Sequence, residues 1–200
     1  AEPHEMLAQV YGAGGQTEKA IASLRAAAER NPRNIDVLMA LASHHERQKD
    51  FAASRELYDK ILAVNPRHGP ALNNLAYLHA EHLGDLAKAQ ELAQRAREVL
   101  PNDPMIADTL GWIMYRQGQY AWALALLQES AARLPDHAEI QYHLGMAQYM
   151  TGAEAAARST LVKALQLAAD FPGRADAVQR LEVLSIDATT PAATGRAAFE

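Results

Sequence analysis

The side chains with the most evident chemistry are the histidines, of which the chain has eight. His79 and His82 are three residues apart, so a helix would place them on one face, and the pair His44-His45 lies upstream. Imidazole nitrogens on neighbouring helices can ligate a transition metal. The chain has no HExxH motif and no cysteine, however, and a histidine on a helix is more often a packing residue. The sequence therefore predicts no metal site and no cofactor.

Catalysis would require a nucleophile beside an oriented base, or paired carboxylates in a pocket. Serine, histidine and aspartate are present, but they stand at no recognisable catalytic spacing. Carboxylates such as Glu18, Glu56, Asp59 and Glu91 fall where the solvated face of a helix is expected. The sequence therefore predicts a chain that is not an enzyme. The alternative is the regulatory or targeting region of a larger enzyme, because a chain that begins with Ala1 is interpreted as a fragment or a processed form.

Composition and charge narrow the class of protein further. The formal net charge is −5 without a block of like charges, so the basic face that a nucleic acid would need is missing. The apolar runs are shorter than the ~18 residues of a membrane-spanning helix. The absence of cysteine fits any compartment. Hydrophobic residues make up 49% of the chain and aromatic residues only 6%, which favours closely packed helices rich in alanine and leucine.

One pattern recurs along the chain and indicates how its side chains are positioned. Four prolines follow one another at spacings of 34, 35 and 34 residues: Pro32, Pro66, Pro101 and Pro135. In each unit a leucine is followed by a small residue, at Leu7-Ala8, Leu41-Ala42, Leu75-Ala76, Leu110-Gly111 and Leu144-Gly145. A further small residue returns later, at Ala20, Ser54, Ala89, Ala123 and Ala157. Small side chains allow two antiparallel helices to approach closely, and the leucines fill the space beside the crossing.

The pattern predicts five pairs of helices joined by short turns. The turns fall at Gly15, Lys49-Asp50, Gly84-Asp85, Gly118-Gln119 and Gly152, since glycine tolerates the left-handed conformation that ends a helix. The expected helices span residues 2–13, 17–30, 34–47, 51–63, 69–82, 86–99, 104–116, 119–133, 138–150 and 154–169. A further amphipathic helix over residues 174–184 is expected to cap the array, and residues 186–200 are expected to form a flexible tail.

These features resemble the tetratricopeptide repeat. The match covers residues 1 to about 169, and in the first unit Leu7, Ala8, Tyr11, Ala20, Ala27 and Pro32 all follow the family pattern. The resemblance implies an all-α, right-handed superhelix of five repeats, at 1–34, 35–68, 69–103, 104–137 and 138–171, with a capping helix at 173–185. Two departures stand out. The third unit has one extra residue within 80–84, and the fifth has Ala169 where the closing proline is expected.

Three short phrases resemble a narrower group of proteins. LNNLAY at 72–77, DTLGW at 108–112 and YHLGM at 142–146 are similar to phrases in bacterial tetratricopeptide proteins of exopolysaccharide export and exosortase systems. The resemblance implies a non-catalytic scaffold that binds a protein or peptide in a bacterial envelope or secretion assembly. It leaves the compartment open between periplasm and cytoplasm, with the periplasm favoured. A self-assembling array, in which the stack contacts a second copy, is another alternative.

The family resemblance also implies where a partner would bind. The first helices line the concave side through the second, fifth, sixth, ninth, twelfth and thirteenth positions of each unit. The partner-binding residues expected there are Asn73, Asn74, Tyr77, Asp108, Trp112, Tyr115, Arg116, Tyr142, His143, Met146 and Tyr149. Glu46, Glu81, Thr109 and Glu139 also occupy such positions. Tyr77, Trp112 and Met146 are equivalent and are expected to form one stripe, with Tyr115 and Tyr149 forming a second.

Amides beside aromatic and methionine side chains suit a peptide-binding groove. The alternative is that Trp112 and the tyrosines only pack between adjacent first helices. Two binding modes of the family are not supported, because the carboxylate clamp lacks its ninth-position asparagine and the asparagine ladder retains only Asn74. Trp122 lies on a second helix, where it either covers a neighbouring repeat or anchors a partner or a second copy.

Overall fold

The computed structural model describes residues 16–189, and all regular structure in that range is helical. The helices are α2 (Thr17–Arg30), α3 (Ile35–Arg47), α4 (Phe51–Val64), α5 (Gly69–Leu78), η1 (His79–Leu83), α6 (Leu86–Val99), α7 (Pro104–Arg116), α8 (Tyr120–Arg133), α9 (Ala138–Met150), α10 (Glu154–Leu167) and α11 (Arg174–Thr189). Their bounds agree closely with the predicted ones. The helix expected over residues 2–13 lies outside the described residues.

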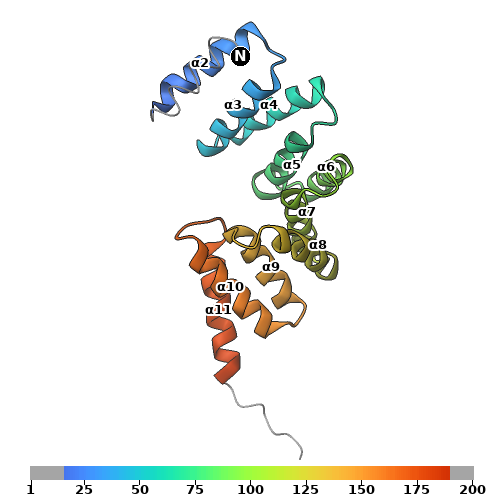
Figure 1. Cartoon of the computed structure of the whole chain (residues 1–200), viewed down its shortest axis with the longest axis vertical. Helices are drawn as coiled ribbons and strands as arrows, with labels where there is room; N and C mark the ends of the chain where they lie inside the picture. The colour runs from blue at the N-terminus through green and yellow to red at the C-terminus, as the bar shows by residue number, and fades with distance from the viewer. Residues whose placement is uncertain (1–15, 190–200) are drawn as a thin grey trace, which may run out of the picture.

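The helices stack in pairs into an elongated, curved array that runs from α2 to α11 (Figure 1). Within a pair the contacts are extensive, as between α3 and α4 or between α7 and α8. Between pairs, α5 contacts α7 and α7 contacts α9, so these three first helices form a continuous inner row. The prediction of an all-α solenoid of helix pairs is confirmed.

Small residues at the helix crossings determine how closely each pair packs. A Cβ atom on Gly111 would lie 2.9 Å from Cγ of Leu127, and one on Gly145 would lie 2.7 Å from Cγ of Leu161. Such distances are below van der Waals contact, so α8 and α10 approach α7 and α9 more closely than an alanine would allow. Ala42 at the equivalent position of the second unit is fully buried, with 0% of its surface exposed.

Several helix starts are fixed by a side chain that caps them. The capping oxygens belong to Asn34, Asp50, Asp85 and Asp103, which accept hydrogen bonds from the backbone N–H groups of Val37, Ala53, Lys88 and Met105 respectively. Each bond pairs an N–H group that has no partner within the helix. The caps therefore set the phase of α3, α4, α6 and α7, and with it the residues that face inward.

The extra residue of the third unit is accommodated by a π-helical turn. α5 continues directly into η1, and Gly84 ends it with φ +71° and a backbone bond from its N–H to the carbonyl oxygen of His79. A π turn closes i→i+5 bonds and so holds one more residue than an α turn. The insertion therefore stays within the helix end, and α6 keeps its repeat position.

The capping helix α11 packs on α10 and α9 and buries Ala177 and Leu184. It continues to Thr189, so the predicted helix end near residue 184 is corrected, and the rest of the tail predicted over residues 186–200 lies outside the described residues. Residues 174–189 contain no proline or glycine that would break the helix.

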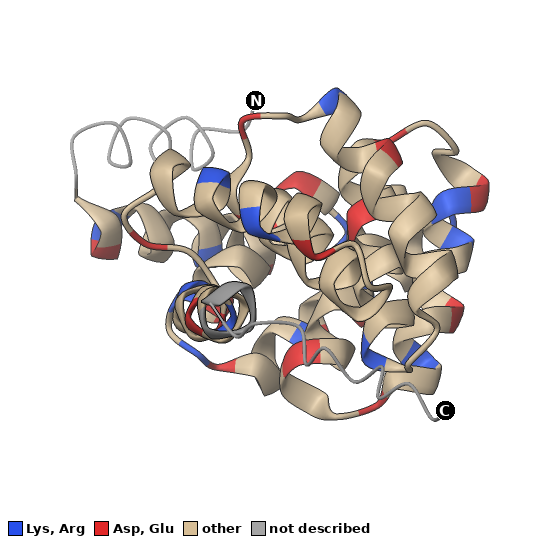
Figure 2. Cartoon of the chain, turned by 90° about the horizontal axis from the view of Figure 1, so that it is seen from below, with Lys and Arg blue, Asp and Glu red and all other residues tan. Residues whose placement is uncertain are grey.

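Charged residues of both signs are intermixed over the helices (Figure 2). Among the helices that the structure describes, none is long and apolar enough to span a membrane.

Candidate functional site

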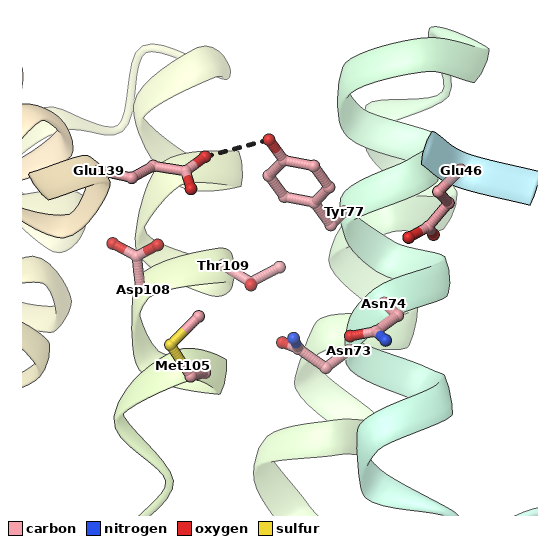
Figure 3. A pocket seen from close by; sticks show the side chains of 8 residues that line it. All are labelled: Glu46, Asn73, Asn74, Tyr77, Met105, Asp108, Thr109 and Glu139. Atoms are coloured by element: carbon pink, nitrogen blue, oxygen red, sulfur yellow. Dashed lines mark hydrogen bonds between the residues drawn. The ribbon is translucent and has the colours of Figure 1, made fainter. Parts of the chain in front are cut away.

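A pocket of about 240 Å³ opens on the inner row of helices (Figure 3). It lies where α3, α5, α7 and α9 converge, so four successive first helices contribute to it. The lining residues are Glu46, Asn73, Asn74, Tyr77, Met105, Asp108, Thr109 and Glu139. Four of the predicted binding residues therefore come together here: Asn73, Asn74, Tyr77 and Asp108.

The two asparagines on α5 have different environments. Asn74 donates a hydrogen bond from Nδ2 to Oη of Tyr58, over 3.2 Å, and is thereby held by the outer helix α4. Burial raises the pKa of Tyr58 to about 12, so this phenol stays neutral. Asn73 is 8% exposed and its Oδ1 atom is buried without a hydrogen-bond partner. A buried amide oxygen without a partner is costly, so Asn73 has an unused acceptor at the pocket wall.

Glu139 and Tyr77 connect the third and fifth units across the pocket. The Tyr77 hydroxyl donates a hydrogen bond to Oε1 of Glu139 over 3.1 Å (Figure 3). Burial, and then the adjacent Glu139 carboxylate, raise the pKa of Tyr77 far above its ordinary value. The phenol is therefore a fixed donor that orients the carboxylate of Glu139, which keeps further acceptor capacity.

Asp108, which lines the pocket, pairs with the buried side chain of His143. Nδ1 of His143 lies 3.0 Å from both carboxylate oxygens of Asp108, and both residues are buried. Burial by itself lowers the pKa of His143, but the charge of Asp108 and their hydrogen bond outweigh it and raise the pKa above its ordinary value. The pair therefore favours a protonated imidazole facing a carboxylate.

A second network joins the third and fourth units at the edge of the groove. Glu81 accepts a hydrogen bond from Nε1 of Trp112 over 3.0 Å and forms an ion pair with Arg116 over 2.7 Å. Arg116 also donates to the carbonyl oxygen of Ala80. The π turn η1 supplies both acceptors, so the inserted residue shapes this edge of the inner face.

Most of the other predicted residues form an aromatic cluster that packs against α11. The Trp112 ring stacks on Tyr115 with centroids 4.7 Å apart and on His143 with centroids 4.1 Å apart. Tyr142 donates a hydrogen bond to Asp176 of α11 over 3.3 Å, and the guanidinium of Arg180 lies 4.1 Å from the centroid of Tyr149. The N-terminal half of α11 therefore lies against the inner face of the last repeat.

This cluster corrects the expectation of an open aromatic stripe. Trp112 is 8% exposed and Met146 is 6% exposed, while Tyr77 alone of the three equivalent residues reaches the pocket. The alternative in which Trp112 packs between adjacent first helices describes the observed geometry. Sequence periodicity places the three side chains on one face, but it does not show that α11 turns back over that face.

The sequence analysis places the pocket residues Glu46, Thr109 and Glu139 at concave positions but outside the expected partner-binding set, and it does not name Met105. The signal for them was the position within the repeat. Met105 and Glu139 both stand second in their units, and Thr109 stands sixth. The expected binding set contains mainly aromatic residues rather than carboxylates, because a carboxylate on a helix usually faces solvent.

Two other expectations concern residues outside the pocket. Trp122 on α8 is 71% exposed, so it does not cover a neighbouring repeat, and its use as an anchor stays a prediction.

The histidines considered for a metal site have other contacts. His82 stacks on Phe51 with ring centroids 3.8 Å apart, and Nδ1 of His45 lies 3.1 Å from Oδ2 of Asp50. Within residues 16–189, no group of three or more His, Asp or Glu side chains is arranged to hold a metal ion.

Comparison with known proteins identifies the family. Models described as tetratricopeptide repeat match residues 5–63, 39–104 and 114–184. A TPR repeat-containing protein of Pseudomonas aeruginosa is 33% identical over 138 residues, which are 69% of this chain and 23% of that protein. The chain thus spans about a quarter of the length of this curated relative.

Solved structures share the fold at lower sequence identity. PilW, described as a widely conserved type IV pilus biogenesis factor, superposes with a TM-score of 0.72 at 19% identity, covering 92% of this chain and 90% of that one. YrrB, described as a TPR protein with an unusual peptide-binding site, superposes with a TM-score of 0.63 at 19% identity, covering 94% and 91%. With helix pairs, crossing residues and family models in agreement, the chain belongs to the tetratricopeptide-repeat family.

Proposed function

We propose that this chain is a non-catalytic scaffold that holds an extended protein segment in the pocket and groove of its inner helices. The fold is that of a protein–protein interaction module. The observation that carries the proposal is the unpaired buried amide oxygen of Asn73, in a pocket built by four successive first helices. A backbone N–H group of a bound segment would complete that amide's hydrogen bonding.

The size of the pocket supports a segment rather than a metabolite. Small-molecule sites usually enclose roughly 300–1,000 Å³ and are mostly apolar. This pocket has about 240 Å³, which is below that range. One side chain and a stretch of backbone fit such a space better than a cofactor does.

Site-specific photo-crosslinking tests the proposal. A photoreactive amino acid at Met105, which lines the pocket and is 40% exposed, should crosslink to one defined segment of a partner in a bacterial lysate. The same amino acid at Glu98, which is exposed on the outer helix α6, is the control. Crosslinks of equal yield and identity from both positions would contradict binding in the groove.

We further propose that this chain and its bound partner form part of an assembly in the bacterial envelope. The short phrases within 72–77, 108–112 and 142–146 support this setting, and the Pseudomonas aeruginosa relative supports a bacterial origin. Fractionation of cells that express the full-length protein at its native level tests it. Recovery of both the protein and its crosslinked partner in the cytosol alone would contradict it.

A further inference from the structure

The charges of the pocket point to the chemistry of its occupant. Its carboxylates come from three different helices, with Glu46 at the end of α3, Asp108 on α7 and Glu139 on α9. Figure 3 shows Glu139 and Asp108 entering from one side and Glu46 from the other. Among the described residues that line the pocket, none is a lysine or arginine. The interior is therefore negative without a lining cation.

Among the described residues, Glu46 and Glu139 lack the arginine or lysine partner that several other carboxylates have. Glu81 and Glu129 each form an ion pair over 2.7 Å, with Arg116 and Arg97. In the part of the chain that the structure describes, no lysine or arginine forms an ion pair with Glu46 or Glu139.

The side chains that donate hydrogen bonds to these two carboxylates carry neutral hydroxyl groups. Glu46 receives a hydrogen bond from Ser54 over 3.4 Å, and Glu139 receives one from Tyr77 over 3.1 Å. A hydroxyl donor orients a carboxylate without neutralising its charge. Burial raises the pKa of Glu46 above its ordinary value, and the hydrogen bonds and the charge of Arg47 offset this only in part. A cation brought into the pocket would remove that penalty.

The unpaired amide of Asn73 is an independent indication that a donor belongs in the same space. Asn73 is more than nine-tenths buried and its Oδ1 atom accepts nothing. Figure 3 shows this amide at the pocket wall beside Asn74 and Thr109. A group that carries several N–H donors and a positive charge would satisfy the amide oxygen and the carboxylates together.

We propose that the pocket binds the lysine or arginine side chain of an extended protein segment, with the charge held by Glu46, Glu139 and Asp108 and an N–H donor on Asn73. This inference rests on the proposed function and specifies its partner as a basic segment. Lysine offers three N–H donors and arginine five, and neither has an acceptor that would oppose the carboxylates. Asp108 already faces His143, so Glu46 and Glu139 contribute most of the unbalanced charge.

Four pools of labelled nonapeptides test the inference. The flanking positions are randomised over Ala, Gly, Ser, Leu and Asn, and the central residue is fixed as Lys, Arg, Gln or Glu. Affinity for the wild-type chain is measured by fluorescence anisotropy at low and high salt. The Lys and Arg pools should bind at least about tenfold more tightly than the Gln and Glu pools, as expected for charge-assisted hydrogen bonds. Their binding should also weaken with salt.

Two variants assign that binding to the pocket. Glu46→Gln and Glu139→Gln each keep the side-chain shape and a hydrogen-bond acceptor, and each should weaken binding of the Lys and Arg pools by about tenfold. Glu98→Gln makes the same charge change on the exposed face of α6 and should leave binding unchanged. Circular dichroism confirms that the variants are folded.

The outcomes separate this inference from the proposed function. Gln or Glu pools that bind as tightly as the basic pools, and that lose affinity on Asn73→Leu, would overturn the basic occupant and leave the groove function intact. Basic pools that bind but are equally weakened by Glu98→Gln would show a nonspecific charge effect and overturn the assignment to the pocket. Absence of binding by every pool would contradict both.

Discussion

At the scale of single residues, the side chain of Asn73 is expected to lower the stability of the fold while it contributes to binding. Its amide is buried without a partner for Oδ1. Leucine has nearly the same shape and no polar atom to satisfy, so Asn73→Leu should raise the free energy of unfolding, by about 1 kcal/mol. The same change should weaken binding of a captured segment, because the amide acceptor is lost. Urea denaturation and peptide titration measure the two effects.

A variant less stable than wild type would contradict this account of Asn73, because it would mean that the amide is already satisfied. Asn74→Leu is the matched comparison on the same helix. Asn74 donates to Tyr58 over 3.2 Å, so its replacement removes a partner that exists and should destabilise the chain by about 1–3 kcal/mol.

His143 makes stability depend on pH through its pair with Asp108. The folded-state pKa of His143 is raised above its ordinary value, because the Asp108 charge outweighs the effect of burial. The folded chain therefore holds this proton more tightly than the unfolded chain does. The resulting stability is fully present below the unfolded pKa of about 6.5 and is lost as pH rises through the higher folded pKa.

His143→Gln keeps a hydrogen-bond donor but cannot be protonated, and so isolates this contribution. The difference in unfolding free energy between wild type and variant should be largest near about pH 6 and should shrink towards about pH 9. Urea denaturation over this range gives the two curves. A difference that is constant with pH would mean that the pKa of His143 is the same in the folded and the unfolded chain.

At the scale of helices, α11 is part of the structural core rather than an appendage. Leu184 is 1% exposed and belongs to the same apolar cluster as Trp112, Tyr142 and Leu161. Leu184→Ala should therefore destabilise the chain by about 2–5 kcal/mol, as large-to-small changes in a core do. Thermal unfolding followed by circular dichroism measures the loss.

Val178 provides the control within the same helix, because it is 40% exposed. Val178→Ala should change the free energy of unfolding by about 0.5 kcal/mol or less. Equal effects of the two substitutions would mean that α11 does not cap the last repeat through Leu184.

The helices were predictable from the sequence because short-range features determine them. The leucine–glycine pairs at 110–111 and 144–145 sit at real helix crossings, where even a Cβ atom would collide with Leu127 or Leu161. The extra residue of the third unit was visible in the sequence, but not that a π turn absorbs it and supplies Glu81 to Trp112. That contact joins residues 31 positions apart and depends on how two repeats stack.

The site was predictable only in part, for the same reason. Repeat position predicts that Asn73, Asn74, Tyr77 and Asp108 share one face, and all four line the pocket. It could not show that α11 covers Tyr142 and Met146, because that depends on the direction in which the chain leaves the last repeat. Gly173, with φ +83°, makes this turn, and a Cβ atom there would overlap the ring of Tyr142.

At the scale of the whole molecule, two surfaces compete as the place where a partner binds. The inner pocket is built by four successive first helices and contains carboxylates and amides, whereas Trp122 is a single exposed aromatic residue on α8. Isolated apolar residues on a surface are common and need no partner. A pocket with an unpaired amide and unbalanced carboxylates has the stronger physical reason to be filled. Self-association through Trp122 is not tested by the structure and stays a prediction.

Oxidative footprinting distinguishes these surfaces in one measurement. Met105 in the pocket is 40% exposed and Trp122 on the outer helix is 71% exposed, and hydroxyl radicals oxidise both side chains. The chain is exposed to radicals with and without the segment identified by crosslinking at Met105, and oxidation is quantified by mass spectrometry. The account predicts that the bound segment protects Met105 several-fold and leaves Trp122 unchanged. Protection of Trp122 with Met105 still fully reactive would contradict it.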